Sequence, residues 1–140
     1  MSKVTRGDLQ ELARVRLGEA RLLLDGKSFS GAYNLTGLAI ECALKARIAR
    51  STDQYEFPDL KRAQDSWKHE LNQLLATAGL TDQHARNSDI DKQFEANWHT
   101  VKDWKVVSRY EQRSERQAID IYRAATEQAH GIMAWIERYW

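Results

Sequence analysis

The segment that most restricts the fold is GAYNLTGLAIECALKARIAR, which runs from Gly31 to Arg50. Most of its residues are apolar or small, and they leave no continuous polar side that could face water. A helix with this pattern is covered on most sides by other elements. Asn34, Glu41 and Lys45 are separated by seven and four residues, which places them on one helical face. The segment therefore predicts a buried helix that carries an acid and a base on the same side.

This acid and base allow two interpretations. In one, Glu41 and Lys45 form a surface ion pair between residues four apart, which contributes about 0.2–0.5 kcal/mol. In the other, their face lines a groove or a subunit interface, where the charges are held for recognition. The spacing is compatible with both.

Helical periodicity continues along the rest of the chain. Thr5 with Asp8 gives a capping signal for a first helix, and Gly26 can end it. Ser30 is the expected cap of the second helix. We expect helices over residues 5–26, 30–50, 66–80, 89–104 and 114–136, with a long polar connection over 51–66.

The fourth and fifth helices are defined by their apolar residues. On the fourth helix, apolar residues spaced three or four positions apart form one stripe, which consists of Ile90, Phe94, Trp98, Val101 and Trp104. No segment alternates with a period of two for long enough to be a strand. The sequence therefore predicts an all-α, up-and-down bundle of about five helices. It forms one domain over residues 1–140, with the second helix the most buried.

Composition narrows the functional classes. The net charge is +1, so the protein as a whole does not attract nucleic acid or a membrane, and any such binding must be local. The single cysteine, Cys42, excludes an internal disulfide and fits a reducing compartment. No apolar run approaches the roughly 18 residues of a membrane span, so we expect a cytoplasmic protein. We expect no cofactor or metal, because neither ligand spacing nor a glycine-rich phosphate loop is present.

The second helix resembles the corresponding helix of the HEPN domain family. The family pattern A-Y-x-x-x-G-x-A-x-E-x-x-L-K-A is matched by Ala32, Tyr33, Gly37, Ala39, Glu41, Leu44, Lys45 and Ala46. Further along, KHELNQLL, which contains His69, is similar to the start of a family helix with a histidine before leucines. The segment SRYEQRSERQAIDIYRAATEQAHGIMAWI is similar to the family's arginine–tyrosine turn and terminal helix. The resemblance covers most of the chain and keeps the order of the elements.

HEPN domains are small helical bundles associated with nucleotidyltransferases, toxin–antitoxin systems and RNA cleavage. The resemblance therefore implies a homodimer that binds a nucleotide or RNA, or that pairs with a nucleotidyltransferase. Nuclease members of the family carry an arginine, four to six further residues, and then a histidine. In such a motif the arginine stabilises phosphate charge and the histidine performs acid–base chemistry without a metal.

Two pairs in this chain have the nuclease spacing: Arg62 with His69, and Arg123 with His130. Arg62 lies in or near the long connection, so its separation from His69 carries no fixed geometry. Arg123 and His130 are expected on one face of the last helix. Entering that helix, where the motif more often lies, residues 114–116 include no histidine.

We therefore expect a non-catalytic binding module. A metal-independent endoribonuclease that uses Arg123 and His130 is one alternative. A helical interaction protein without a nucleotide role is the other.

The expected ligand site combines residues that are distant in the sequence. An anion is held best by two or more positive donors in a partly dry site, so Lys45, His69 and Arg109 have to converge. Glu41 then orients Lys45 or Arg109, and Tyr110 offers its ring or hydroxyl. In the competing structural interpretation, Glu41 and Arg109 form an internal ion pair that ties the second helix to the turn before the last one.

Overall fold

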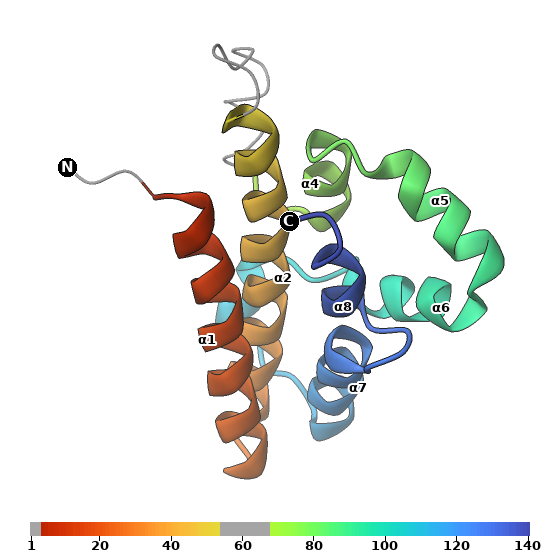
Figure 1. Cartoon of the computed structure of the whole chain (residues 1–140). Coiled ribbons are helices and arrows are strands. Elements are labelled where there is room, and N and C mark those ends of the chain that lie inside the picture. The colour runs from red at the N-terminus through yellow and green to blue at the C-terminus, as the bar shows by residue number, and fades with distance from the viewer. Residues whose placement is uncertain (1–3, 54–67) are drawn as a thin grey trace.

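The computed structural model describes residues 4–53 and 68–140. These residues form seven α-helices and one 3-10 helix, and no strand occurs among them (Figure 1). The elements are α1 (Arg6–Asp25), α2 (Phe29–Asp53), α4 (Leu71–Thr77), α5 (Thr81–Ile90), α6 (Lys92–Val101), η1 (Val106–Tyr110), α7 (Glu115–Thr126) and α8 (Ile132–Ile136). The predicted all-α class is confirmed, and the expected connection lies largely outside the described residues.

The first helix begins and ends where its sequence signals predict. Thr5 and Asp8 form a capping box, in which each side chain accepts a hydrogen bond from the backbone N–H of the other. At the other end, the backbone N–H of Gly26 donates to the carbonyl of Leu22 at 3.0 Å. Lys27 then adopts a positive φ of 62°, which turns the chain back toward α2.

Helix α2 is the centre of the bundle, with α1 on one side and most other helices on the other (Figure 1). It contacts α1, α4, η1, α7 and α8. Its fully buried residues include Ala32, Ala39, Ile40, Ala43, Leu44 and Ala46, and every residue from Ala39 to Leu44 is buried. Among the described helices α2 holds the most buried residues, as predicted, although the short helix α8 is buried over a larger share of its length.

The expected cap of α2 is wrong. The helix begins at Phe29, so Ser30 lies inside its first turn. The Ser30 hydroxyl instead accepts a hydrogen bond from the backbone N–H of Arg113 at 2.8 Å. A side chain that could cap its own helix therefore fastens the segment before α7, a long-range contact that local sequence signals do not reveal.

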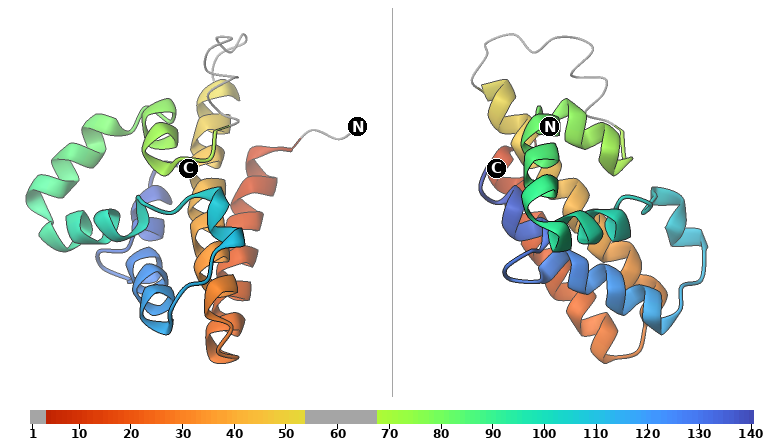
Figure 2. Two further views of the ribbon diagram at one scale, coloured as in Figure 1. Left: turned by 180° about the vertical axis from the view of Figure 1, so that it is seen from behind. Right: turned by 90° about the vertical axis from the view of Figure 1, so that its right-hand side faces the viewer.

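Gly37 lets an aromatic ring lie directly against α2. A Cβ atom at this position would lie 2.2 Å from three atoms of the Trp104 indole. Trp104 follows the end of α6 and is buried, although the sequence placed it on the fourth helix. From here the chain crosses α2 through η1, which is visible in the view from behind (Figure 2).

The region before Trp104 holds one helix more than expected. Helix α5 spans Thr81–Ile90, and most of it lies between the third and fourth predicted helices. Ile90, taken as the start of the apolar stripe, is its exposed last residue. The break is explained by Asp91, whose carboxylate accepts a hydrogen bond from the N–H of Phe94 at 3.0 Å and so caps α6. Phe94, Trp98 and Val101 are buried as predicted.

The expected last helix is two helices. Helix α7 starts where it was predicted to start, with a capping box formed by Ser114 and Gln117, but it ends at Thr126. The Glu127 carboxylate then accepts hydrogen bonds from the N–H groups of Ala129 and His130, which closes a turn. Gly131 fits this turn because a Cβ there would lie 2.1 Å from the carbonyl oxygen of Glu127. The turn redirects α8 into the core.

Four rings pack together where α5, α6 and α8 meet. The imidazole of His84 lies 4.7 Å from the Trp98 ring and 5.7 Å from the Trp135 ring, measured between centroids, and Phe94 completes the group. Burial lowers the pKa of His84, which favours its neutral form at physiological pH. Among the described helices, none is long and apolar enough to cross a membrane.

Candidate functional site

Three of the predicted site residues lie together. Nδ1 of His69 is 2.7 Å from one carboxylate oxygen of Glu41, and Nζ of Lys45 is 3.4 Å from the other. Glu41 and Lys45 come from adjacent turns of α2. His69 lies just before α4, so the cluster joins two separate segments of the chain.

Burial differs sharply within this cluster. Glu41 is 4% exposed, whereas the side chains of Lys45 and His69 are 19% and 49% exposed. A carboxylate withdrawn from water needs charged or hydrogen-bonding partners, and both of its oxygens have one. The predicted ion pair between Glu41 and Lys45 therefore forms, but its interpretation as a solvated surface pair is wrong, because the acid is buried.

The cluster leaves donors available to a ligand. An ionised carboxylate can only accept hydrogen bonds, so the Nδ1–H of His69 donates to Glu41. The ring's Nε2 lies outside this bond, and it donates to a ligand only when the imidazole is protonated. The ammonium of Lys45 has three N–H groups. This side of the bundle can therefore present a histidine nitrogen and an ammonium group in front of a buried acid.

Cys42, next to Glu41, is not an activated nucleophile. Burial raises the pKa of its thiol, and the negative charge of Glu41 raises it further. Lys45 and Arg16 oppose these effects without reversing them. A thiol that stays protonated reacts slowly, so the cluster does not offer a cysteine for covalent chemistry.

Arg109 and Tyr110 lie on η1 and are both exposed. The guanidinium carbon of Arg109 lies 5.0 Å from the centre of the Tyr110 ring, a cation–π contact between neighbours. The competing interpretation, an ion pair between Glu41 and Arg109, is wrong, because the carboxylate oxygens of Glu41 are taken by Lys45 and His69. Within the described part of the chain, the contacts of Arg109 and Tyr110 do not join them to that cluster.

The geometry expected for Arg123 and His130 is also wrong. The two were placed on one face of a single helix, but α7 ends between them, and His130 lies in the turn before α8. Nδ1 of His130 is 2.7 Å from the Asp91 carboxylate. This hydrogen bond raises the pKa of His130 and lowers that of Asp91.

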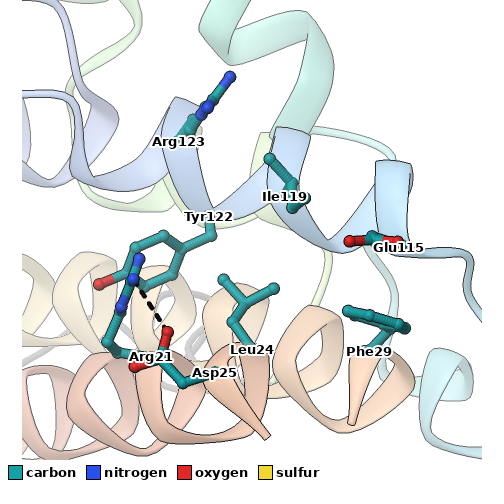
Figure 3. Close-up of a pocket in the computed structure, with 8 residues that line it drawn as sticks. All are labelled: Arg21, Leu24, Asp25, Phe29, Glu115, Ile119, Tyr122 and Arg123. Atoms are coloured by element: carbon teal, nitrogen blue, oxygen red, sulfur yellow. Dashed lines mark ion pairs between the residues drawn. The ribbon is translucent and has the colours of Figure 1, made fainter. Parts of the chain in front are cut away.

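A cavity of about 210 Å³ lies elsewhere, where the α1–α2 turn meets α7. Its lining consists of Arg21, Leu24, Asp25, Phe29, Glu115, Ile119, Tyr122 and Arg123. Arg21 pairs with Asp25 at 2.9 Å and lies over the Tyr122 ring, whereas Arg123 extends away from the other side chains (Figure 3). Sequence reasoning missed this cavity, because its lining comes from three helices and only the four-residue spacing of Arg21 and Asp25 was visible.

The cavity contains two bases and two acids, so its formal charge is balanced and it favours no charged ligand class. Among the described residues, no group of three or more His, Cys, Asp and Glu side chains could hold a metal ion. Comparisons with protein-family models, curated proteins and solved structures found no match to this chain.

Proposed function

We propose that this protein is a non-catalytic, HEPN-like binding module of the cytoplasm that recognises a phosphate group of a nucleotide or RNA. The ligand binds at Lys45 and His69. From the HEPN resemblance we further propose that the module works as a homodimer or together with a nucleotidyltransferase partner.

The burial of Glu41 behind two partly exposed nitrogen groups supports this proposal. A carboxylate in that position fixes the direction of the imidazole and the ammonium before a ligand arrives, which reduces the entropy lost on binding. Because the carboxylate itself is almost fully buried, an approaching anion meets the nitrogen groups first.

Phosphate is the ligand class that suits these groups. Its oxygens accept several hydrogen bonds, and those from an ammonium or a protonated imidazole are stronger than neutral ones. One ammonium and one imidazole do not read a base sequence, so recognition at this cluster is directed to the phosphate.

Binding of inorganic phosphate, a nucleoside monophosphate and a short single-stranded oligoribonucleotide, each followed by calorimetry, tests the proposal. Lys45→Ala should abolish binding while the chain stays folded, because His69 still pairs with Glu41, and circular dichroism checks the fold. Lys92→Ala is the matched control, because it removes one lysine charge from an exposed position on α6 and should bind like the wild type.

The competing interpretation is that the cluster only fastens α2 to the segment before α4. In that case the wild type binds none of the three ligands, and Glu41→Ala costs about 3–5 kcal/mol of folding free energy, as expected when a buried charge pair is broken. A wild type that binds no phosphate-containing ligand refutes the proposal, and a helical interaction protein without a nucleotide role would then remain.

We do not propose intrinsic RNA cleavage. The alternative based on Arg123 and His130 required both side chains on one helical face, and α7 ends between them. His130 is instead bonded to Asp91.

A further inference from the structure

The cavity between the end of α1 and α7 is balanced in charge as a whole, but its two ends carry opposite charges. Figure 3 shows Glu115 at the end marked by the Phe29 ring. The opposite end, marked by Tyr122, holds the Arg21–Asp25 pair and Arg123. The first end therefore has a formal charge of minus one and the second a formal charge of plus one.

Apolar side chains separate the two ends. Leu24 of α1 and Ile119 of α7 lie between them, and both are partly buried (Figure 3). The volume of about 210 Å³ is below the roughly 300 Å³ at which pockets for drug-sized ligands begin. A ligand that fits this cavity is therefore small and has an apolar middle.

The two end charges are available to a ligand. Within residues 4–53 and 68–140, no hydrogen bond or ion pair engages the side chain of Glu115 or Arg123. Arg21 donates to Asp25 at 2.9 Å, but a guanidinium has five N–H groups, so others remain. Glu115 and Arg123 are eight residues apart, which is about 12 Å along the axis of α7.

The dipole of α7 gives these two charges another role. Glu115 lies in the first turn and Arg123 in the last turn, where an acid and a base respectively are favourable. That role requires neither a cavity nor apolar side chains between the charges. A measurement of binding, and not of stability, therefore separates the two roles.

We propose that this cavity binds a small dipolar molecule, which has an amine at one end, a carboxylate at the other and an apolar body between them. The amine pairs with Glu115, and the face of the Phe29 ring is a further favourable contact for a cation. The carboxylate pairs with the remaining N–H groups of Arg21 and with Arg123, which turns toward the cavity on binding. A short peptide with free ends and a linear amino acid share this chemistry.

Titration of the full chain with leucyl-leucine and with ε-aminocaproate, followed by nuclear magnetic resonance, tests the proposal and distinguishes the two sources. Leucyl-leucine should bind about tenfold more tightly than either its N-acetyl or its C-terminal amide derivative. Each cap removes one charge-assisted contact, and a contact of that kind corresponds to about this factor.

Variants assign each end of the ligand. Glu115→Gln should remove the preference for leucyl-leucine over its N-acetyl derivative, and Arg123→Gln should reduce the preference over the amide. Ile119→Trp should abolish binding, because the larger side chain fills the cavity, and circular dichroism checks its fold. The matched control is Arg116→Gln, an exposed change on the same helix outside the cavity lining, which should bind like the wild type.

This site is separate from Lys45 and His69, so these variants should bind inorganic phosphate as the wild type does, and the two proposals can fail independently. A wild type that binds neither leucyl-leucine nor ε-aminocaproate overturns the proposal of a dipolar ligand. So does binding that the two end caps leave unchanged, or binding that persists in folded Ile119→Trp.

Discussion

Replacement of Gly37 by alanine should destabilise the protein, although alanine is the better helix former. The added Cβ would lie 2.2 Å from three indole atoms of Trp104, and ordinary van der Waals contact begins near 3.4 Å. The ring would therefore have to retreat by at least the difference, about 1.2 Å, within a closely packed core.

The magnitude follows from two opposing contributions. Helix propensity favours alanine by about 1 kcal/mol. Overpacking costs about 1–3 kcal/mol, and expelling an aromatic side chain from the core raises the cost to about 3–5 kcal/mol. Because Trp104 is almost fully buried against the α2 backbone, the larger cost applies, and we expect a net loss of about 2–4 kcal/mol.

Urea unfolding followed by helical circular dichroism measures this loss. Gly18→Ala is the matched control, and it should gain up to about 1 kcal/mol, since its new methyl group meets no atom within 4 Å. In a double-mutant cycle, Trp104→Leu should cost less in the Gly37→Ala background than in the wild type. If Gly37→Ala is as stable as the wild type, the inferred contact between this backbone and the indole is refuted.

Three further predictions concern single features of the fold. The pKa of His130 is raised above 6.5 and that of Asp91 is lowered below 3.8, so their pairing should stabilise the fold most between about pH 4 and 6.5. The contribution should disappear as the pH rises through the pKa of folded His130 or falls through that of Asp91, and the stability difference between wild type and His130→Gln measures it. Cys42 should react with a thiol reagent much more slowly in the native protein than in urea, and equal rates would contradict its burial. Gly131→Ala should lower the melting temperature by several degrees, because its Cβ overlaps the Glu127 carbonyl; an unchanged temperature would argue against this turn.

The sequence correctly predicted the helix starts that depend only on residues within one turn. The Thr5–Asp8 and Ser114–Gln117 capping boxes both form, since each needs only residues within one turn. The buried character of α2 was also readable, because its apolar residues surround the helix. The helix breaks at Asp91 and Glu127 were not predicted. Each of these side chains accepts hydrogen bonds from nearby backbone N–H groups, and this competes with continued helix formation.

The candidate site was only partly readable for a different reason. Glu41 and Lys45 share a helix, so their proximity followed from spacing, whereas the position of His69 beside them depends on how α4 packs against α2. Arg109 was expected in the same cluster because an anion is held best by two or more positive donors. The path of η1 across α2 leaves it exposed beside Tyr110 instead.

The central position of α2 has a consequence for how the molecule opens. Five other elements pack against this helix, so its backbone N–H groups can reach water only when most of the bundle separates. Helix α5, which packs mainly on α6, can open while the rest stays folded. Hydrogen exchange should therefore report global unfolding at residues 36–46 and local fluctuation at residues 81–90. The protein would then unfold as one cooperative unit, except for helix α5, which opens on its own.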